Sequence, residues 1–394
     1  MEQWYYKQIA PRANRLGQHS TPSPFKIILL MFLLSRLYFL TIAIFSTYFI
    51  KTEPGYLGVQ VSQGEPFWAW VWANMDGRHF VKIATLGYTG TNFAYFPLYP
   101  LLINLFSRLG LTPIYAGILI GGLATIFSLF FLLKIIDFDG YGGKDKRRFS
   151  LEVIILLLFF PFAFILTSVY SDPLFLLLTT ASFYFARSRH WLIAGIFAFL
   201  ASLTRLSGIA LIPALALEWW LQGGKKKIDW RGLIAPLGSL LGFVVYPLYL
   251  QIQFGNWRLF QSSFSAWKQD QFVLLPQVIF RYLKILTTVS PALLVYWVAA
   301  LELVSFILYF ALAIYVTKKI RVSYGVFMIV SLSLVTFTGT LAGTPRYLIH
   351  LFPAFIGLAY LFKRHPRYRF VYYPATFILG ILITAFFVQG YFVG

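Results

Sequence analysis

The sequence of 394 residues contains no cysteine, and only five of its residues are histidines. Without cysteine, disulfide bonds and thiolate metal ligands are excluded. The histidines show no paired spacing of the kind that metal ligands have, so the sequence supports no metal site and no cofactor. Their positions are His19, His79, His190, His350 and His365.

Nucleotide-binding patterns are also missing from the sequence. The segment GYGGKDK at residues 140–146 is the one glycine cluster beside a basic run on the predicted inner face, and it lacks Walker spacing. No strand-GxGxxG-helix unit occurs anywhere in the chain. We therefore expect no domain that binds a nucleotide sugar.

Polar residues are too few for a soluble globule. Hydrophobic residues make up 59% of the chain and aromatic residues 20%, and the mean hydropathy is +0.73. This composition predicts a multi-pass membrane protein surrounded by lipids. It also predicts one integral membrane domain over residues 1–394, with an all-α polytopic fold.

Acidic residues are scarce beside basic ones, with 13 Asp and Glu against 33 Lys and Arg and a net charge of +20. Such a charge can indicate a nucleic-acid partner, but here the basic residues gather in short loops between apolar segments, which marks the cytoplasmic side of a membrane protein. We therefore expect no nucleic-acid partner. The basic clusters are 144–148, 187–190, 225–231, 318–321 and 363–369.

About eleven membrane-spanning helices are expected, because roughly 20 apolar residues are needed to cross a hydrocarbon layer of about 30 Å. Residues 1–25 lack a short apolar core with a cleavage signal and are interpreted as a cytoplasmic tail. The predicted spans are 26–49, 112–136, 150–170, 173–187, two short runs within 191–221, 231–253, 291–316, 322–341, 346–362 and 370–392.

Residues 51–110 are expected to form an external loop with re-entrant or interfacial helices. The apolar piece 93–109 is broken by Pro97 and Pro100, which argues against a straight span. If it were a full span, the basic cluster 144–148 would lie on the external side, whereas short basic loops favour the cytoplasmic side of a membrane.

The stretch from Trp68 to Pro100 combines ionisable groups with large aromatic rings. Its tryptophans favour the headgroup level of a bilayer. The spacing that starts at Asp76 predicts a helix that Gly87 ends, with Asp76 and His79 on neighbouring positions of one face. We interpret this stretch as the reaction site.

Asp76 is the candidate general base. A hydroxyl that attacks an anomeric carbon needs a carboxylate within hydrogen-bond reach, and one carboxylate suffices for a single displacement with inversion. The alternative is that Asp76 only caps the helix, since Asp favours helix starts. Asp172, in the turn Tyr170-Ser171-Asp172-Pro173, is predicted on the same face and is the second candidate base.

The same stretch resembles a known family. The residues that carry the likeness are Asp76-Gly77, Ile83-Ala84, Gly87-Tyr88 and Phe96-Pro97-Leu98-Tyr99-Pro100, which look like the first lumenal loop of the PIG-V family. That family comprises the second mannosyltransferase of glycosylphosphatidylinositol (GPI) synthesis and its prokaryotic relatives.

The resemblance implies a GT-C membrane fold and a specific reaction. The enzyme would be an inverting, metal-independent glycosyltransferase that moves a hexose, by implication mannose. The donor would be a polyprenyl-phosphate sugar, or dolichyl-phosphate mannose in a eukaryote. The acceptor would be lipid-linked or a glycan on the outer or lumenal face, which cytosolic nucleotide sugars do not reach.

A phosphate leaving group needs positive charge or hydrogen-bond donors nearby. Arg205 and Arg346 are the preferred phosphate partners, because Thr204-Arg205 with Gly208 and Pro345-Arg346-Tyr347 are similar to family contexts. The alternative is that both arginines reach the headgroups or pair with Asp172 structurally.

Other residues of the predicted outer half are candidates for substrate binding. Tyrosines there would stack on sugar or define the groove, with packing as the alternative. The intramembrane charges Arg36 and Glu302 are functional candidates for which the sequence indicates no partner. The remaining candidates for substrate binding are Arg78, His79, Tyr88, Tyr99 and Tyr170.

A secondary transporter or lipid flippase is the alternative class, since it would also have many spans, intramembrane charges and a proline-broken helix. Such a protein should show two related halves, and the sequence shows none. The lack of cysteine and of a retrieval signal favours a bacterial plasma membrane over an endoplasmic reticulum membrane.

Overall fold

The computed structural model describes residues 24–53, 64–224, 230–267, 269 and 272–393. Every secondary-structure element within these ranges is a helix, in agreement with the predicted all-α class. The predicted cytoplasmic tail, residues 1–25, lies outside the described residues except for its last two.

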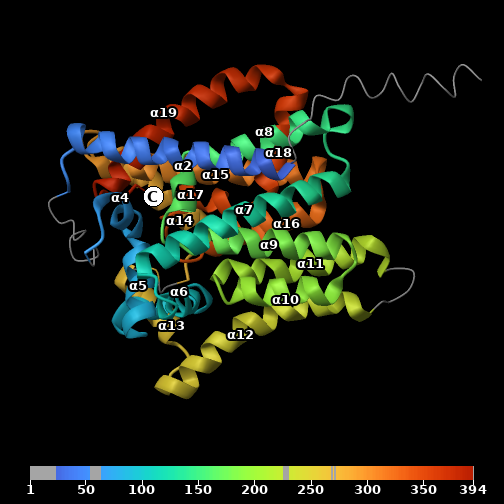
Figure 1. Ribbon diagram of the computed structural model, residues 1–394, viewed down its shortest axis with the longest axis horizontal. Coiled ribbons are helices and arrows are strands. Elements are labelled where there is room, and N and C mark those ends of the chain that lie inside the picture. Colours follow the sequence, from blue (N-terminus) through green and yellow to red (C-terminus); the bar gives the residue numbers. More distant parts are fainter. Residues whose placement is uncertain (1–23, 54–63, 225–229, 268, 270–271, 394) are drawn as a thin grey trace, which may run out of the picture.

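The chain folds into a bundle of long helices joined by short ones (Figure 1). The α-helices are α2 (Pro24–Phe49), α4 (Phe67–Trp70), α5 (Asp76–Leu86), α6 (Leu98–Arg108), α7 (Pro113–Asp139), α8 (Lys146–Leu158), α9 (Asp172–Arg187), α10 (Trp191–Ser202), α11 (Leu211–Trp219), α12 (Ile234–Phe254), α13 (Leu259–Ser262), α14 (Leu275–Thr288), α15 (Leu294–Lys319), α16 (Val322–Thr336), α17 (Thr344–Tyr347), α18 (Pro353–Arg364) and α19 (Arg369–Val388).

Single turns of tighter or wider helix connect these elements. They are η1 (Val71–Ala73), η2 (Gly90–Ala94), η3 (Gly143–Asp145), η4 (Ala163–Thr167), η5 (Leu206–Ala210), η6 (Trp220–Gly224), η7 (Trp230–Leu233), η8 (Ser263–Trp267), η9 (Leu348–His350) and η10 (Pro366–Tyr368).

Five helices of the described residues are long and apolar enough to cross a membrane, and the chain is therefore a multi-pass membrane protein. They are α2, α7, α12 with η7, α15, and α19 with η10. A sixth candidate is the pair Thr344–His350 and Pro353–Arg364, which is bent by 87°. The predicted count of about eleven spans is not confirmed.

Several predicted spans are divided into shorter helices. The predicted span 150–170 is broken because α8 ends at Leu158 and Pro161 follows, where the missing N–H of proline stops the helix. The predicted run 346–362 bends before Pro353. Residues 98–108 form α6, whose 11 residues are too few for a straight span.

Close packing of small residues joins α10 to α12. Gly238 and Gly242 lie one turn apart on α12, and a Cβ atom at either position would come within 2.3 Å of a backbone oxygen of α10. Helices approach this closely only where glycine removes the side chain, as in GxxxG contacts within membranes. Together with α9, which packs against α7 and α10, this pair forms one side of the bundle.

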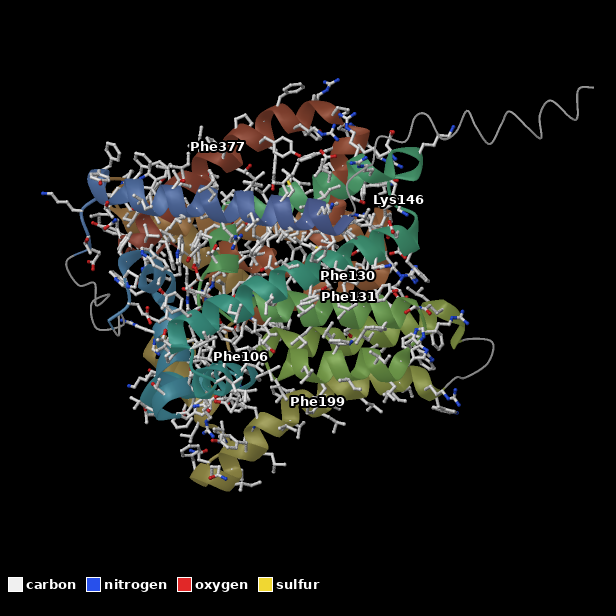
Figure 2. The ribbon with its side chains drawn as sticks, in the orientation of Figure 1. Phe106, Phe130, Phe131, Lys146, Phe199 and Phe377 are labelled. Carbon is white, nitrogen blue, oxygen red and sulfur yellow. The ribbon has the colours of Figure 1, made fainter. Side chains whose placement is uncertain are left out.

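The two ends of the bundle carry different elements, short helices at one end and basic loops at the other. Helices α4, α5, α6 and α13 lie at one end, on the left of Figure 1. Lys146, of the basic cluster 144–148, lies at the opposite end (Figure 2). There the Lys363 ammonium, of the basic cluster 363–369, donates to the Gly142 carbonyl at 2.7 Å, close to the cluster 144–148.

Candidate active site

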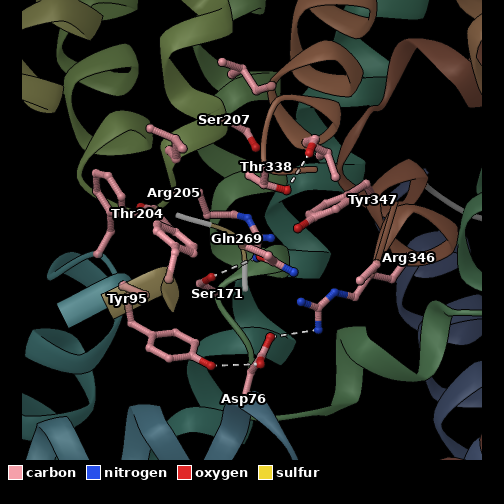
Figure 3. Close-up of a pocket in the computed structure, with 18 of the residues that line it drawn as sticks. Asp76, Tyr95, Ser171, Thr204, Arg205, Ser207, Gln269, Thr338, Arg346 and Tyr347 are labelled. Carbon is pink, nitrogen blue, oxygen red and sulfur yellow. Dashed lines mark hydrogen bonds and ion pairs between the residues drawn. The ribbon is translucent and has the colours of Figure 1, made fainter. Parts of the chain in front are cut away.

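A cavity of about 250 Å³ opens at the end of the bundle that carries α5. Segments far apart in the sequence line it, and three predicted site residues meet there: Asp76 from α5, Arg205 from the start of η5, and Arg346 from α17 (Figure 3). Leu334, Val335 and Phe264 supply an apolar part of the wall. The cavity therefore combines a carboxylate, two guanidinium groups and an apolar surface.

Asp76 is the first residue of α5, and its carboxylate faces the cavity. The Arg346 guanidinium lies 2.8 Å from Oδ2, and the Tyr95 hydroxyl donates to Oδ1 at 3.0 Å (Figure 3). The side chain keeps 24% of its exposure. Each carboxylate oxygen has a second lone pair, so Asp76 can still accept a hydrogen bond from a bound hydroxyl.

The backbone around Asp76 is held tightly. Met75 precedes it with a φ of 52°, a value that a non-glycine residue adopts only when its surroundings require it. The Val169 amide donates to the Trp72 carbonyl at 2.8 Å, and a Cβ atom at Gly77 would lie 3.3 Å from the Val169 oxygen. The helix start is thus packed against the turn that precedes α9.

Helix α5 has the bounds that the sequence pattern indicated. It runs from Asp76 to Leu86, and Gly87 ends it with a φ of 80°. Gly87 adopts this conformation without the steric cost that a side chain would add.

Arg346 lies between two aromatic rings. Its guanidinium carbon is 5.6 Å from the ring centre of Tyr170 and 5.8 Å from that of Tyr347. The buried Nε has no hydrogen-bond partner among the described residues. Arg346 also lines the cavity and keeps 17% of its side-chain exposure, so a ligand there can contact it.

Asp172 and Arg205 form a second carboxylate–guanidinium pair. Asp172 is completely buried at the start of α9, and Arg205 Nη1 lies 2.7 Å from its Oδ2. The same nitrogen donates to Ser171 Oγ at 3.1 Å (Figure 3). The structural pairing considered for Arg205 is thus present, and Arg205 lines the cavity while it makes this pair.

Two residues near this site were not singled out in the sequence. His350 Nδ1 lies 3.0 Å from Asp172 Oδ1, and the Tyr95 hydroxyl contacts Asp76. The spacing of Arg346 and His350, four residues apart on one helical segment, could have indicated that both face the same side. Tyr95 lies among many other aromatic residues, and no pattern distinguishes it.

The other predicted substrate-binding residues do not line the cavity. Tyr99 is fully buried and donates to the Gly117 carbonyl at 3.1 Å, and Tyr88 donates to the Tyr95 carbonyl at 2.8 Å. The Tyr170 ring packs against the guanidinium group of Arg346. The Arg78 side chain is exposed, and His79 contacts Asn92 and Tyr95.

His79 supports the site through Tyr95. Its ring stacks on the Tyr95 ring with centres 4.9 Å apart, and its Nδ1 is 2.6 Å from Asn92 Oδ1. Burial lowers the pKa of His79, although the Asn92 contact and the charge of Asp76 oppose that shift. Burial and the Asp76 charge raise the pKa of Tyr95 well above its usual value, so Tyr95 stays a neutral donor.

The two intramembrane charges have partners in the structure. Arg36 donates to Thr167 Oγ1 and Ser35 Oγ. Glu302 Oε2 accepts a hydrogen bond of 2.5 Å from Tyr282, whose hydroxyl accepts the Leu341 amide at 2.9 Å. Glu302 and Tyr282 thereby hold the loop that leads to Arg346.

Within the described residues, no group of three or more His, Asp or Glu side chains is arranged to hold a metal ion. The charged groups that line the cavity are the Asp76 carboxylate and the guanidinium groups of Arg205 and Arg346, and the buried Asp172 lies behind Arg205 as its partner. An anionic ligand that entered would meet guanidinium groups already in place.

The described residues thus form an all-helical multi-pass protein with a carboxylate and two arginines around one cavity. Residues 24–218 match the family model described as Mannosyltransferase (PIG-V). This match confirms the resemblance that the first loop indicated, and it identifies the protein as a glycosyltransferase of the mannosyltransferase type. This finding favours the enzyme over the transporter or flippase alternative.

The matched region runs from α2 to α11 and contains Asp76, Asp172 and Arg205. Arg346 and His350 lie beyond it, so their place at the site rests on the structure. No curated protein matches the chain.

Proposed function

We propose that this protein transfers mannose from a polyprenyl-phosphate carrier to a lipid-linked or glycan acceptor, with inversion at the anomeric carbon. The observation that carries this proposal is the cavity in which the Asp76 carboxylate lies beside two arginines. A base for the acceptor and cations for a phosphate leaving group are the two requirements of such a transfer.

The proposed step is a single displacement. The acceptor oxygen forms a bond to the anomeric carbon while the bond from that carbon to the phosphate oxygen breaks. The proton of the acceptor hydroxyl passes to Asp76, and the polyprenyl phosphate leaves with the electron pair. Arg205 and Arg346 stabilise the charge that builds up on the phosphate, because guanidinium groups can donate two hydrogen bonds to phosphate oxygens.

Two features support a lipid phosphate sugar as the donor. The cavity of about 250 Å³ is near the lower end of ligand pockets, whose volumes are roughly 300–1,000 Å³, and suits a headgroup better than a whole nucleotide sugar. Its wall at Leu206, Leu334 and Val335 is apolar, as a lipid tail requires. Both features fit a donor that stays partly in the membrane.

The test is transfer by purified protein. Radiolabelled mannose on a synthetic polyprenyl phosphate should move to a component of membrane extract, whereas GDP-mannose at the same concentration should give none. Transfer from the nucleotide sugar alone would overturn the donor assignment. Analysis of the product linkage by NMR tests inversion.

We also propose that the site faces outward, with about eleven membrane crossings in a GT-C arrangement. The chain has no cysteine, so single cysteines can be introduced without background labelling. Thr89 lies at the site end and Lys144 at the opposite end, and both side chains are exposed. A membrane-impermeant maleimide should label Thr89→Cys in whole cells and Lys144→Cys only after lysis; the reverse pattern would contradict the orientation.

A further inference from the structure

His350 is a buried polar residue that the proposed reaction does not use. It is 1% exposed and lies on η9, directly after α17. Its ring packs edge-on against Phe175 and Tyr347, with ring centres 5.1 Å and 5.6 Å away. Packing from both sides fixes the ring plane, so the direction of its Nδ1 atom is fixed as well.

The Nδ1 atom lies 3.0 Å from Asp172 Oδ1, and the other Asp172 oxygen holds Arg205 at 2.7 Å. A carboxylate paired with an arginine is ionised and can only accept hydrogen bonds. His350 therefore donates through Nδ1–H. Without this donor, one oxygen of a fully buried carboxylate would lack a partner, and the carboxylate would be free to rotate away from Arg205.

The segment from Arg346 to His350 contacts both acidic residues of the site. Arg346 pairs with Asp76, and His350, one helical turn further on, binds Asp172. Tyr347 lies between them and places its ring near both guanidinium groups, 5.6 Å from that of Arg205. One short helical segment thus sets the relative positions of the two arginines.

We propose that His350 is a positioning residue that fixes Asp172, and through it Arg205, in the orientation that binds the donor phosphate. This inference rests on the proposed function, because it assigns the phosphate to Arg205. His350 touches neither the sugar nor the acceptor in this account. Its loss should therefore raise the donor KM and also lower kcat, because Arg205 both binds the phosphate and stabilises the charge that builds up on it.

The decisive variants are His350→Phe, which keeps an aromatic ring but removes the donor, and His350→Asn, whose amide nitrogen can occupy the place of Nδ1. His350→Gln reaches further and places its amide near the position of Nε2. The control is His365→Phe, because His365 is exposed at the opposite end of the bundle.

The measurement is steady-state transfer with synthetic polyprenyl-phosphate mannose, with melting temperatures recorded in detergent. His350→Phe should raise the donor KM about tenfold and lower kcat by a similar or smaller factor, since a hydrogen bond to a charged group typically affects binding on that scale. His350→Asn should restore the donor KM, His350→Gln should not, and His365→Phe should match the wild type.

A folded His350→Phe protein with the wild-type donor KM would overturn the inference, and so would a fall in kcat alone. If His350→Phe does not fold, the two amide variants decide: equal donor KM values for Asn and Gln would contradict a role for Nδ1. Absence of transfer in the wild type would reject the proposed function itself, before any variant is compared.

Asp172→Asn provides an independent check. If His350 acts through Asp172, adding His350→Phe to Asp172→Asn should raise the donor KM less than twofold further, because mutations within one network are not additive. Fully multiplicative effects on the donor KM would mean that His350 acts by another route.

Discussion

Two clusters of acidic residues and arginines lie at opposite ends of this bundle. At the cavity, Asp76 pairs with Arg346 and Asp172 with Arg205. At the other end, a network joins two carboxylates to two arginines through α7, α9, α11 and the start of α16. We call it the Asp139 cluster; its members are Asp139, Arg187, Glu218, Arg321, Ser323 and Tyr324.

The clusters differ in what their charged groups have left to bind. In the Asp139 cluster, Glu218 is completely buried, and its oxygens accept from Arg187, Arg321 and other donors. None of the residues that line the cavity comes from this cluster. At the cavity, Asp76, Arg205 and Arg346 line the open volume, and the Asp76 side chain keeps 24% of its exposure.

The same residue types therefore serve two purposes. A buried carboxylate whose donors are all supplied by the protein holds helices together, whereas a similar group at a cavity keeps capacity for a ligand. Perturbed or buried charges alone do not identify a functional site. Access to an open volume separates the two cases here.

The largest effect on stability is expected in the Asp139 cluster. Glu218→Ala should lower the free energy of unfolding by about 3–5 kcal/mol, because it removes the buried carboxylate that Arg187 and Arg321 share. Thermal melting in detergent measures this loss. The protein that stays folded should keep the wild-type donor KM. A rise of that KM would contradict a purely structural role for the Asp139 cluster.

A clear effect on donor binding is expected at the cavity. Arg205→Ala and Arg346→Ala should each raise the donor KM by roughly 10- to 100-fold, because each removes a charged hydrogen-bond donor from the phosphate. Arg187→Ala is the matched control from the Asp139 cluster and should leave the donor KM unchanged. Normal donor binding in both cavity variants would place the phosphate site elsewhere.

Little effect is expected from Arg78→Ala. The sequence placed Arg78 among the substrate-binding candidates, but its side chain is exposed and does not line the cavity. Transfer assays should give a donor KM and kcat within about twofold of the wild type, the usual range for an exposed side chain. A tenfold change would show that Arg78 reaches the substrate in the bound state.

The smallest expected effect is the contribution of His79 to the pH dependence of stability. Because burial lowers the pKa of His79, the unfolded chain takes up the proton first as the pH falls below about 6.5. His79 therefore costs stability on acidification, and the loss begins near that pH and grows toward the lowered pKa. His79→Gln should flatten the decline in melting temperature between pH 7 and pH 5; an unchanged slope would mean that His79 does not contribute to it.

Much of the fold and site could be predicted from local patterns. The helix from Asp76 to Gly87 follows from its spacing and its terminal glycine, and the long apolar helices follow from composition. Asp76, Arg205 and Arg346 were expected in one site, and the structure places all three at one cavity. Their chemical roles stay predictions until activity is measured.

The parts that sequence reasoning missed depend on contacts between distant segments. His350 meets Asp172 across 178 residues, and no local pattern reports that distance. The predicted count of about eleven spans is not confirmed, because prolines divide some of the apolar runs, as at Pro161 and Pro353. An apolar run shows that a segment avoids water, but it does not show that the segment crosses the membrane unbroken.

The measurement that tests the central claim most directly is the transfer rate of Asp76→Asn at saturating donor. The amide keeps the size of the side chain and can still accept from Tyr95, but it cannot take the acceptor proton, so kcat should fall by a factor of about 10² to 10⁴. The melting temperature and the affinity for polyprenyl-phosphate mannose should stay close to those of the wild type. If Asp76 only capped the helix, Asn would serve nearly as well, and turnover within a few-fold of the wild type would contradict the account and leave Asp172 as the next candidate base.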